Sequence, residues 1–134
     1  MLEPSAYGRG DTSFQAAGGE SGLRRLVDDF YRAMDQRPDS AHIRAMHPRD
    51  LTESRDKLTR FLCGWLGGPS LYREKYGPIS IPQSHRHLVI GAAERDAWLA
   101  CMADALAQQP FAEDFKAYLL RALSVPAERC RNQD

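Results

Sequence analysis

The feature that most constrains the fold of this chain is the recurrence of apolar residues every three or four positions. This spacing matches the α-helical period of about 3.6 residues and indicates amphipathic helices that bury one face. The apolar stripes are Leu23, Leu26, Val27, Phe30, Tyr31 and Met34; Leu58, Phe61, Leu62, Trp65 and Leu66; Trp98, Cys101, Met102, Ala105 and Leu106; and Phe111, Phe115, Tyr118, Leu119, Ala122 and Leu123. No alternating run has the length of a strand, because Ile79–Ile81 is short and lies among prolines. The sequence therefore predicts an all-α fold.

Glycine, proline and capping residues mark the limits of the expected helices. The chain breaks at Gly18-Gly19 and again at Gly67-Gly68-Pro69, and Ser21 is suited to cap the helix that follows the first break. The expected helical segments are residues 12–17, a segment from Ser21 to before Pro38, residues 39–46, a helix from Asp50 or Thr52 to Gly67, residues 91–108, and a last helix with Pro110 in its first turn.

The segment from Gly67 to Ser84 shows no sustained helical period. It contains several glycines and prolines, so we expect it to be mostly loop. A loop of this length inside one domain is usually functional or wrongly assigned. It leads directly into His85, at the start of the connection to the helix that carries Trp98.

Composition narrows the class of protein. The 134 residues include 18 basic and 18 acidic side chains, so the formal net charge is zero. The sequence therefore lacks the excess of positive charge that is typical of proteins that bind nucleic acid or an anionic membrane. No leader-like or membrane-spanning apolar run is found, so we expect a cytoplasmic protein. Cys63, Cys101 and Cys130 have no CxxC spacing, and we expect buried or free thiols rather than a disulfide.

The length and composition predict one domain with short flanking segments. Residues 1–13 are polar and rich in turn-forming residues, residues 14–126 carry the helical pattern, and residues 127–134 form a polar tail that we expect to be disordered. We expect a monomer or a weak homodimer, since exposed aromatics and the N-terminal extension, including Tyr7, are suited to pack against a neighbouring chain.

Several polar groups fall on otherwise apolar surfaces. Tyr31 and Trp98 lie within apolar stripes and each carries one polar tip, while His47 precedes Pro48 at a bend. Such groups need hydrogen-bond partners when they are buried. They therefore mark candidate positions for a polar ligand.

A series of landmarks recurs in the order expected for a known family. These are the Gly18-Gly19 pair, the aromatic pair Phe30-Tyr31, the Gly67-Gly68-Pro69 opening and the run Glu94-Arg95-Asp96-Ala97-Trp98. With these landmarks, the stretch from Phe14 to Leu123 resembles a truncated (2-on-2) haemoglobin, and the tryptophan resembles that of group II. The resemblance implies a truncated globin fold, in which a 2-on-2 helical sandwich surrounds a haem.

The resemblance implies a haem b with His85 as the proximal ligand of the iron. It places Lys57, or Tyr72, near a haem propionate, and His87 as a bystander or a propionate contact. The full set of residues expected around the haem is Phe30, Lys57, Leu58, Phe61, Leu62, Tyr72, His87, Leu88, Ile90 and Met102.

On the distal side the resemblance places Tyr31, His47, Ser54 and Trp98 around the bound gas. Tyr31 and Trp98 can donate hydrogen bonds that slow ligand release. His47 departs from the family pattern, which usually has phenylalanine or tyrosine there. We hypothesise that His47 hydrogen-bonds Tyr31 or the ligand and makes ligand release depend on pH near the imidazole pKa of about 6.5.

The implied function is reversible binding of dioxygen and other diatomic ligands, linked to nitric oxide or peroxide detoxification. Alternatives are a haem peroxidase and a nitric oxide dioxygenase with an external reductase, because the chain carries no nucleotide-binding fingerprint. A third alternative is a helical interaction module without cofactor. A zinc site built from His42, His47, His85 and His87 is a further alternative, although these residues lack the spacing of structural zinc sites.

Overall fold

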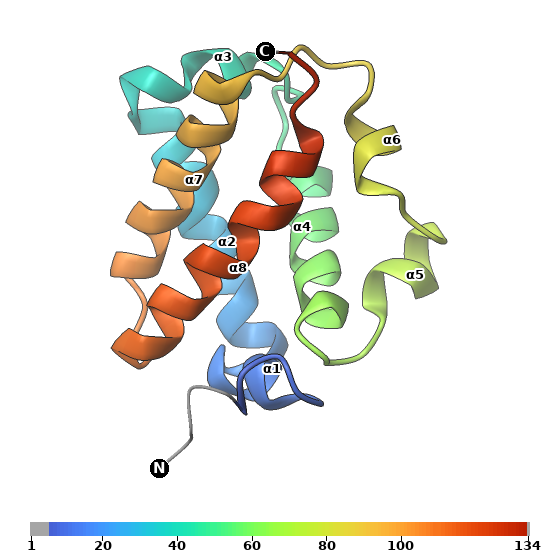
Figure 1. Cartoon of the computed structure of the whole chain (residues 1–134), viewed down its shortest axis with the longest axis vertical. Helices are drawn as coiled ribbons and strands as arrows, with labels where there is room; N and C mark the ends of the chain where they lie inside the picture. The colour runs from blue at the N-terminus through green and yellow to red at the C-terminus, as the bar shows by residue number, and fades with distance from the viewer. Residues whose placement is uncertain (1–5, 134) are drawn as a thin grey trace.

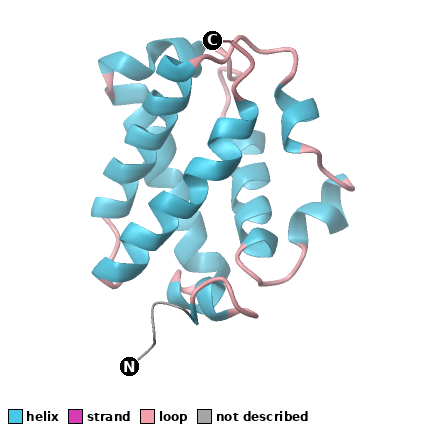
Figure 2. Ribbon diagram, viewed as in Figure 1, coloured by secondary structure: helices cyan, strands magenta, loops and turns pink. Residues whose placement is uncertain are grey.

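The computed structural model describes residues 6–133, apart from the side chains of Pro82 and Ser84. Every regular element in this range is a helix, joined by short turns (Figure 2). The prediction of an all-α fold is therefore confirmed. None of the helices in the described range is long and apolar enough to cross a bilayer.

The helices follow the expected stripes closely. In chain order they are α1 (Thr12–Ala16), α2 (Gly19–Gln36), the 3₁₀ turn η2 (Pro38–Ser40), α3 (Ala41–Ala45), α4 (Thr52–Trp65), α5 (Leu71–Tyr76), α6 (Ile81–His85), α7 (Ala92–Ala107) and α8 (Glu113–Cys130). The four long helices α2, α4, α7 and α8 coincide with the four apolar stripes of the sequence.

The long helices form two pairs that pack against each other. Helix α2 packs against both α4 and α7, and α7 packs against α8. The short helices α5 and α6 lie along one side of this assembly, where α5 contacts α4 and α6 contacts α8 (Figure 1). A cavity lies between the long helices and this side of the assembly.

The hydrophobic core lies where α2, α4, α7 and α8 meet. Leu26, Phe30, Leu62, Met102 and Phe115 are fully buried there. Burying side chains of this size contributes about 1.5–3 kcal/mol each. The core therefore holds the four long helices together and fixes the walls of the cavity.

Two glycines at the predicted breaks are required by close approaches or by backbone geometry. Gly18 has φ +79°, a left-handed conformation that other residues rarely adopt. Gly67 has φ +91°, and a Cβ there would lie 1.8 Å from the carbonyl oxygen of Gly10. Both breaks therefore need glycine to bring α1 against the start of α2 and the end of α4.

The prediction for residues 67–84 was wrong in part, because this segment contains α5 and α6. Helix α5 is short and has few apolar positions, so it leaves no stripe in the sequence. The proline at the start of α6 occupies its first turn, where the missing N–H is not needed. Prolines that suggest a loop here begin a helix instead.

Two expected helix starts also differ. Helix α2 begins at Gly19, so Ser21 lies inside it rather than capping it. Helix α8 begins at Glu113, and Pro110 precedes it in the connection from α7. In both cases the preceding turn geometry, rather than the best capping residue, sets the first helical residue.

The described parts of the flanking segments, residues 6–13 and 127–133, make contacts that the sequence did not indicate. Tyr7 is buried, its ring lies 5.3 Å from that of Phe115, and its hydroxyl donates to Asp114 at 3.0 Å. It packs within its own chain instead of on a neighbour. At the other end, α8 continues past Pro126 to Cys130, beyond the expected start of the tail.

Candidate functional site

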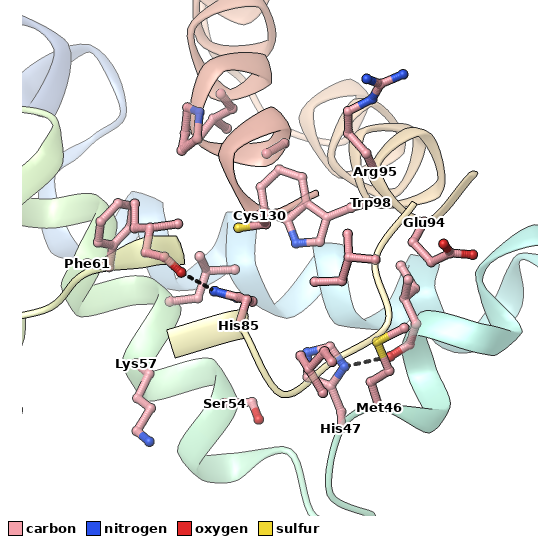
Figure 3. A pocket seen from close by; sticks show the side chains of 18 of the residues that line it. Met46, His47, Ser54, Lys57, Phe61, His85, Glu94, Arg95, Trp98 and Cys130 are labelled. Atoms are coloured by element: carbon pink, nitrogen blue, oxygen red, sulfur yellow. Dashed lines mark hydrogen bonds between the residues drawn. The ribbon is translucent and has the colours of Figure 1, made fainter. Parts of the chain in front are cut away.

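A cavity of about 530 Å³ lies between the long helices and the α5–α6 side of the molecule. This volume is within the range of about 300–1,000 Å³ that is typical of sites for small molecules and cofactors. Figure 3 shows that its walls come from widely separated parts of the chain. The expected site residues that line it are Tyr31, His47, Ser54, Lys57, Leu58, Phe61, Tyr72, His85, Leu88, Ile90 and Trp98.

His85 is the last residue of α6, and one of its ring nitrogens is already hydrogen-bonded. Its Nδ1 lies 2.8 Å from the carbonyl oxygen of Ile81, one turn earlier (Figure 3). A carbonyl oxygen only accepts, so Nδ1 must carry the proton. In the neutral ring, Nε2 is then unprotonated and its lone pair is available to a metal ion.

Tyr31 and Trp98 present polar tips to the cavity. Tyr31 is only 4% exposed, yet no described group hydrogen-bonds its hydroxyl or the indole nitrogen of Trp98. Within the described residues, no fully buried polar side-chain atom lacks a partner, so both tips open onto the cavity. Burial raises the pKa of Tyr31, which keeps the phenol protonated as a donor.

The structure bears on one part of the hypothesis for His47, the hydrogen bond to Tyr31. Its Nδ1 donates to the carbonyl oxygen of Ile43 at 2.8 Å, and its ring meets that of Tyr31 edge to face, with 5.6 Å between centroids. The contact with Tyr31 is therefore aromatic packing rather than a hydrogen bond. Burial lowers the pKa of His47 below its ordinary value, and the bond to Ile43 offsets part of this shift.

The α4–α5 side of the cavity carries a cation. Lys57 pairs with Glu53 at 2.9 Å, its side chain is 44% exposed, and its ammonium lies 5.3 Å from the centre of the Tyr76 ring. Tyr72 packs beside Tyr76, with 5.1 Å between the ring centroids. Lys57 is thus placed to meet an anionic group at the cavity edge.

Four expected contacts do not line the cavity. Phe30, Leu62 and Met102 are fully buried in the core, and His87 is exposed. Phe30 lies directly behind the wall, with ring centroids 4.9 Å from Tyr31 and 5.0 Å from Trp98. These core residues therefore support the lining from behind.

Sequence reasoning missed part of the lining. The additional residues are Ile43, Met46, Ile79, Ile81, Glu94, Arg95, Leu123, Pro126, Ala127 and Cys130. The last four follow the helical pattern i, i+3, i+4 and i+7, so they continue the stripe of α8 past its expected end. That periodicity was a usable signal, although Pro126 obscures it.

The zinc interpretation is wrong for the part of the chain that the structure describes. His42 pairs with Glu94 at 3.1 Å, whereas His87 is exposed. Among residues 6–133, no three histidine, cysteine, aspartate or glutamate side chains gather in a way that could hold a metal ion. The three cysteines are free thiols at separate positions.

Comparisons with known proteins agree on one family. The model of the bacterial-like globin family matches residues 12–127. The chain is 35% identical over 115 residues to the group 2 truncated haemoglobin of Bacillus subtilis, covering 86% of this chain and 85% of the relative.

Solved structures give the same result. A group II 2-on-2 haemoglobin from Agrobacterium tumefaciens is 36% identical with a TM-score of 0.86, covering 92% of this chain and 95% of that one. The truncated oxygen-avid haemoglobin from Bacillus subtilis is 33% identical with a TM-score of 0.82, covering 90% and 98%. The helical arrangement described above is thus that of a 2-on-2 sandwich.

Proposed function

Because this chain belongs to the bacterial-like globins, and among them resembles the group II truncated haemoglobins, we propose that it binds haem b through His85. The bound haem would reversibly take up dioxygen and other diatomic ligands. The observation that carries this proposal is the hydrogen bond from Nδ1 of His85 to Ile81, which leaves Nε2 as the free nitrogen at the cavity.

The residues present fit a haem. The cavity is lined mainly by apolar side chains such as Leu58, Phe61, Leu88 and Ile90, as a macrocycle requires. Two donors, on Tyr31 and Trp98, open onto the same cavity without a protein partner. A cavity with free Nε2 atoms on His85 and His47 and two unused donors is suited to a cofactor that holds a polar ligand.

When bound, haem supplies an iron centre that takes up a diatomic ligand and exchanges electrons. His85 would hold the iron through Nε2, and its bond to Ile81 fixes the orientation of the ring. The Tyr31 hydroxyl and the Trp98 indole would donate hydrogen bonds to a ligand in the cavity. Leu58 and Phe61 exclude water, which strengthens these hydrogen bonds.

The edge of the cavity would receive the polar part of the cofactor. Lys57 is the cation at the α4–α5 side, and its half-exposed position lets it pair with a propionate without full desolvation. Tyr72 lines the same side and offers a phenol as a second contact. His87 is exposed, and we assign it no contact with the macrocycle.

We further propose that tight ligand binding serves redox detoxification of nitric oxide or peroxide. Two donors in a dry cavity slow ligand release, which suits chemistry at the iron better than delivery of oxygen. The similarity to a haemoglobin described as oxygen-avid supports the tight binding of oxygen on which this proposal rests. Turnover would need an external reductase. We place the protein in the cytoplasm, where its three free thiols stay reduced, as a monomer or weak homodimer.

Oxygen dissociation from the haem-loaded protein, followed by stopped flow, tests the ligand-binding function. We expect a reversible oxygen complex. Dissociation of oxygen should then limit the rate at which carbon monoxide replaces it. Purified protein that takes up haem but only oxidises on exposure to air, with no reversible complex, would contradict oxygen binding. In that case, turnover of peroxide by the same sample would favour the peroxidase alternative.

A further inference from the structure

The connection between α6 and α7, residues 86–91, forms a non-helical part of the cavity wall. Leu88 and Ile90 from this connection line the cavity just after His85. Among the described turn and loop bonds, its local backbone hydrogen bonds are from Arg86 to Gln83 at 3.3 Å and from Leu88 to His85 at 3.0 Å at its start, and from Arg95 of α7 to Gly91 at 3.1 Å at its end. Other backbone groups of the connection must therefore find partners elsewhere.

Those partners come from the C-terminal strap, which we define as residues Arg131–Gln133. The backbone N–H groups of Asn132 and Gln133 both donate to the carbonyl oxygen of Ile90, at 2.7 and 3.0 Å. The Asn132 side chain accepts from the Ile90 N–H at 2.9 Å and donates to the Leu88 carbonyl at 2.7 Å. Asn132 thus makes three of the four bonds between the two segments.

The strap is fixed to the rest of the molecule. It directly follows α8, whose residues Ala127 and Cys130 line the same cavity. Glu128 in the last turn of α8 pairs with Arg95 of α7 and with Arg131 of the strap. Figure 1 shows the C-terminal segment running beside the connection from α6 to α7. The strap therefore joins the end of α8 to the segment that follows His85 in the chain.

The bonds to Ile90 matter most because Ile90 is buried, at 8% exposure, whereas the bond from Asn132 to Leu88 is exposed to solvent. A buried backbone N–H or C=O that loses its partner destabilises the local structure by far more than an exposed one. The asparagine amide is matched to its place, because its oxygen accepts from Ile90 and its nitrogen donates to Leu88. A side chain without both functions cannot replace it.

We propose that Asn132 is a positioning residue for the iron ligand. By holding Leu88 and Ile90, it fixes the segment that follows His85 and so limits how far His85 can move from the haem iron. The proposal rests on haem binding through His85, as proposed above. It assigns to the C-terminal strap a role in retaining the cofactor and in setting the strength of the bond between histidine and iron.

The test compares Asn132→Ala with wild type. Haem transfer to excess apomyoglobin gives the rate of haem loss, which we expect to rise about tenfold in Asn132→Ala because two hydrogen bonds are lost. The ferrous iron–histidine stretching band, measured by resonance Raman, is expected to shift. Hydrogen exchange of the Ile90 amide is expected to accelerate by a similar factor.

Three variants make the comparison specific. Gln133→Ala keeps the backbone bond of residue 133 and is expected to match wild type, whereas Asn132→Asp keeps the acceptor for Ile90 and is expected to fall between. Tyr7→Ala destabilises the opposite end of the molecule and should leave the iron–histidine band unchanged.

The proposal would be overturned if Asn132→Ala had the same rate of haem loss, the same band position and the same Ile90 exchange rate as wild type. An equal band shift in Tyr7→Ala would also overturn it, because the effect would then be general destabilisation. If the wild-type protein takes up no haem, the proposed function fails, and the Ile90 exchange rate alone decides whether the strap holds the connection.

Discussion

At the scale of single residues, the cavity is defined by which polar atoms already have partners. His85 and His47 each use Nδ1 on the carbonyl oxygen of the residue four positions earlier, at 2.8 Å in both cases. Tyr31 and Trp98 keep their donors for the cavity. His85 and His47 therefore each leave Nε2 as a free acceptor, and the cavity also holds two free donors. These free groups are the chemical basis of the proposed ligand site.

Tyr31→Phe tests the donor role at this scale. It keeps the ring in the core and removes the hydroxyl that faces the cavity, so the dissociation rate of bound oxygen should rise about tenfold. Stopped-flow displacement by carbon monoxide measures this rate. Tyr118→Phe is the matched control, because Tyr118 packs against Tyr7 away from the cavity and its variant should keep the wild-type rate. Equal rates in Tyr31→Phe and wild type would remove Tyr31 from the ligand site.

His47 makes the folded state sensitive to acid. Its pKa is lowered by burial, so the unfolded chain binds the proton more readily and stability rises with pH around this group. We expect the wild-type free energy of unfolding to fall as the pH drops below about 6.5, and to fall less steeply in His47→Phe. Urea titrations between about pH 5 and 7.5 measure the slopes. His87→Phe, at an exposed position, should keep the wild-type slope.

At the scale of elements, most of the fold could be predicted, because the four long helices carry continuous apolar stripes. The sequence did not reveal α5 and α6, since helices of five or six residues leave no stripe and are held by tertiary contacts. Residues that belong to the resemblance, such as His85, Tyr31 and Trp98, line the cavity, and their roles toward a ligand stay predictions. The contribution of the last turns of α8 was missed, because Pro126 resembles a helix end.

Helix α5 depends on one carboxylate of α4. Asp56 accepts from Lys75 at 2.8 Å and from Tyr76 at 2.7 Å, both in α5, and also from Arg60 at 2.9 Å. These partners hold the pKa of Asp56 well below its ordinary value. Asp56 therefore ties α5, which carries Tyr72 of the cavity lining, to α4.

We expect Asp56→Asn to lower the free energy of unfolding at pH 7 by about 1–3 kcal/mol, as for hydrogen bonds to a charged group. Because the folded pKa is depressed, this contribution is present above about pH 4 and is lost as the pH falls through the folded value. The difference between variant and wild type should shrink on acidification. Asp96→Asn, with its exposed single pair, serves as control. A difference that grows in acid would contradict this assignment.

At the scale of the whole molecule, the described segments near either end, residues 6–11 and 131–133, are packed onto the globin helices and their connections. Tyr7 packs on Phe115 at the start of α8, and the C-terminal strap bonds to the connection between α6 and α7. We propose that the folded unit extends beyond residues 14–126 and includes these segments. Neither contact could be predicted from the sequence, because polar and turn-rich segments give no periodic signal.

Tyr7→Ala measures the N-terminal contribution. Removing the buried ring should lower the free energy of unfolding by about 3 kcal/mol, as for other buried aromatic side chains. Tyr7→Phe keeps the ring and loses only the bond to Asp114, so we expect a loss of about 1 kcal/mol. Chemical denaturation of both variants gives the values. A change below about 0.5 kcal/mol in Tyr7→Ala would mean that residues 6–11 do not contribute to the folded unit.

The central claim is that His85 binds haem iron, and the absorption spectrum of His85→Gly with and without free imidazole tests it most directly. Wild-type protein should give ferric, ferrous and carbon monoxide spectra of a histidine-ligated haem. The variant should lose this signature and regain it when imidazole fills the vacated position. A variant whose spectra equal those of wild type without imidazole would show that another residue binds the iron.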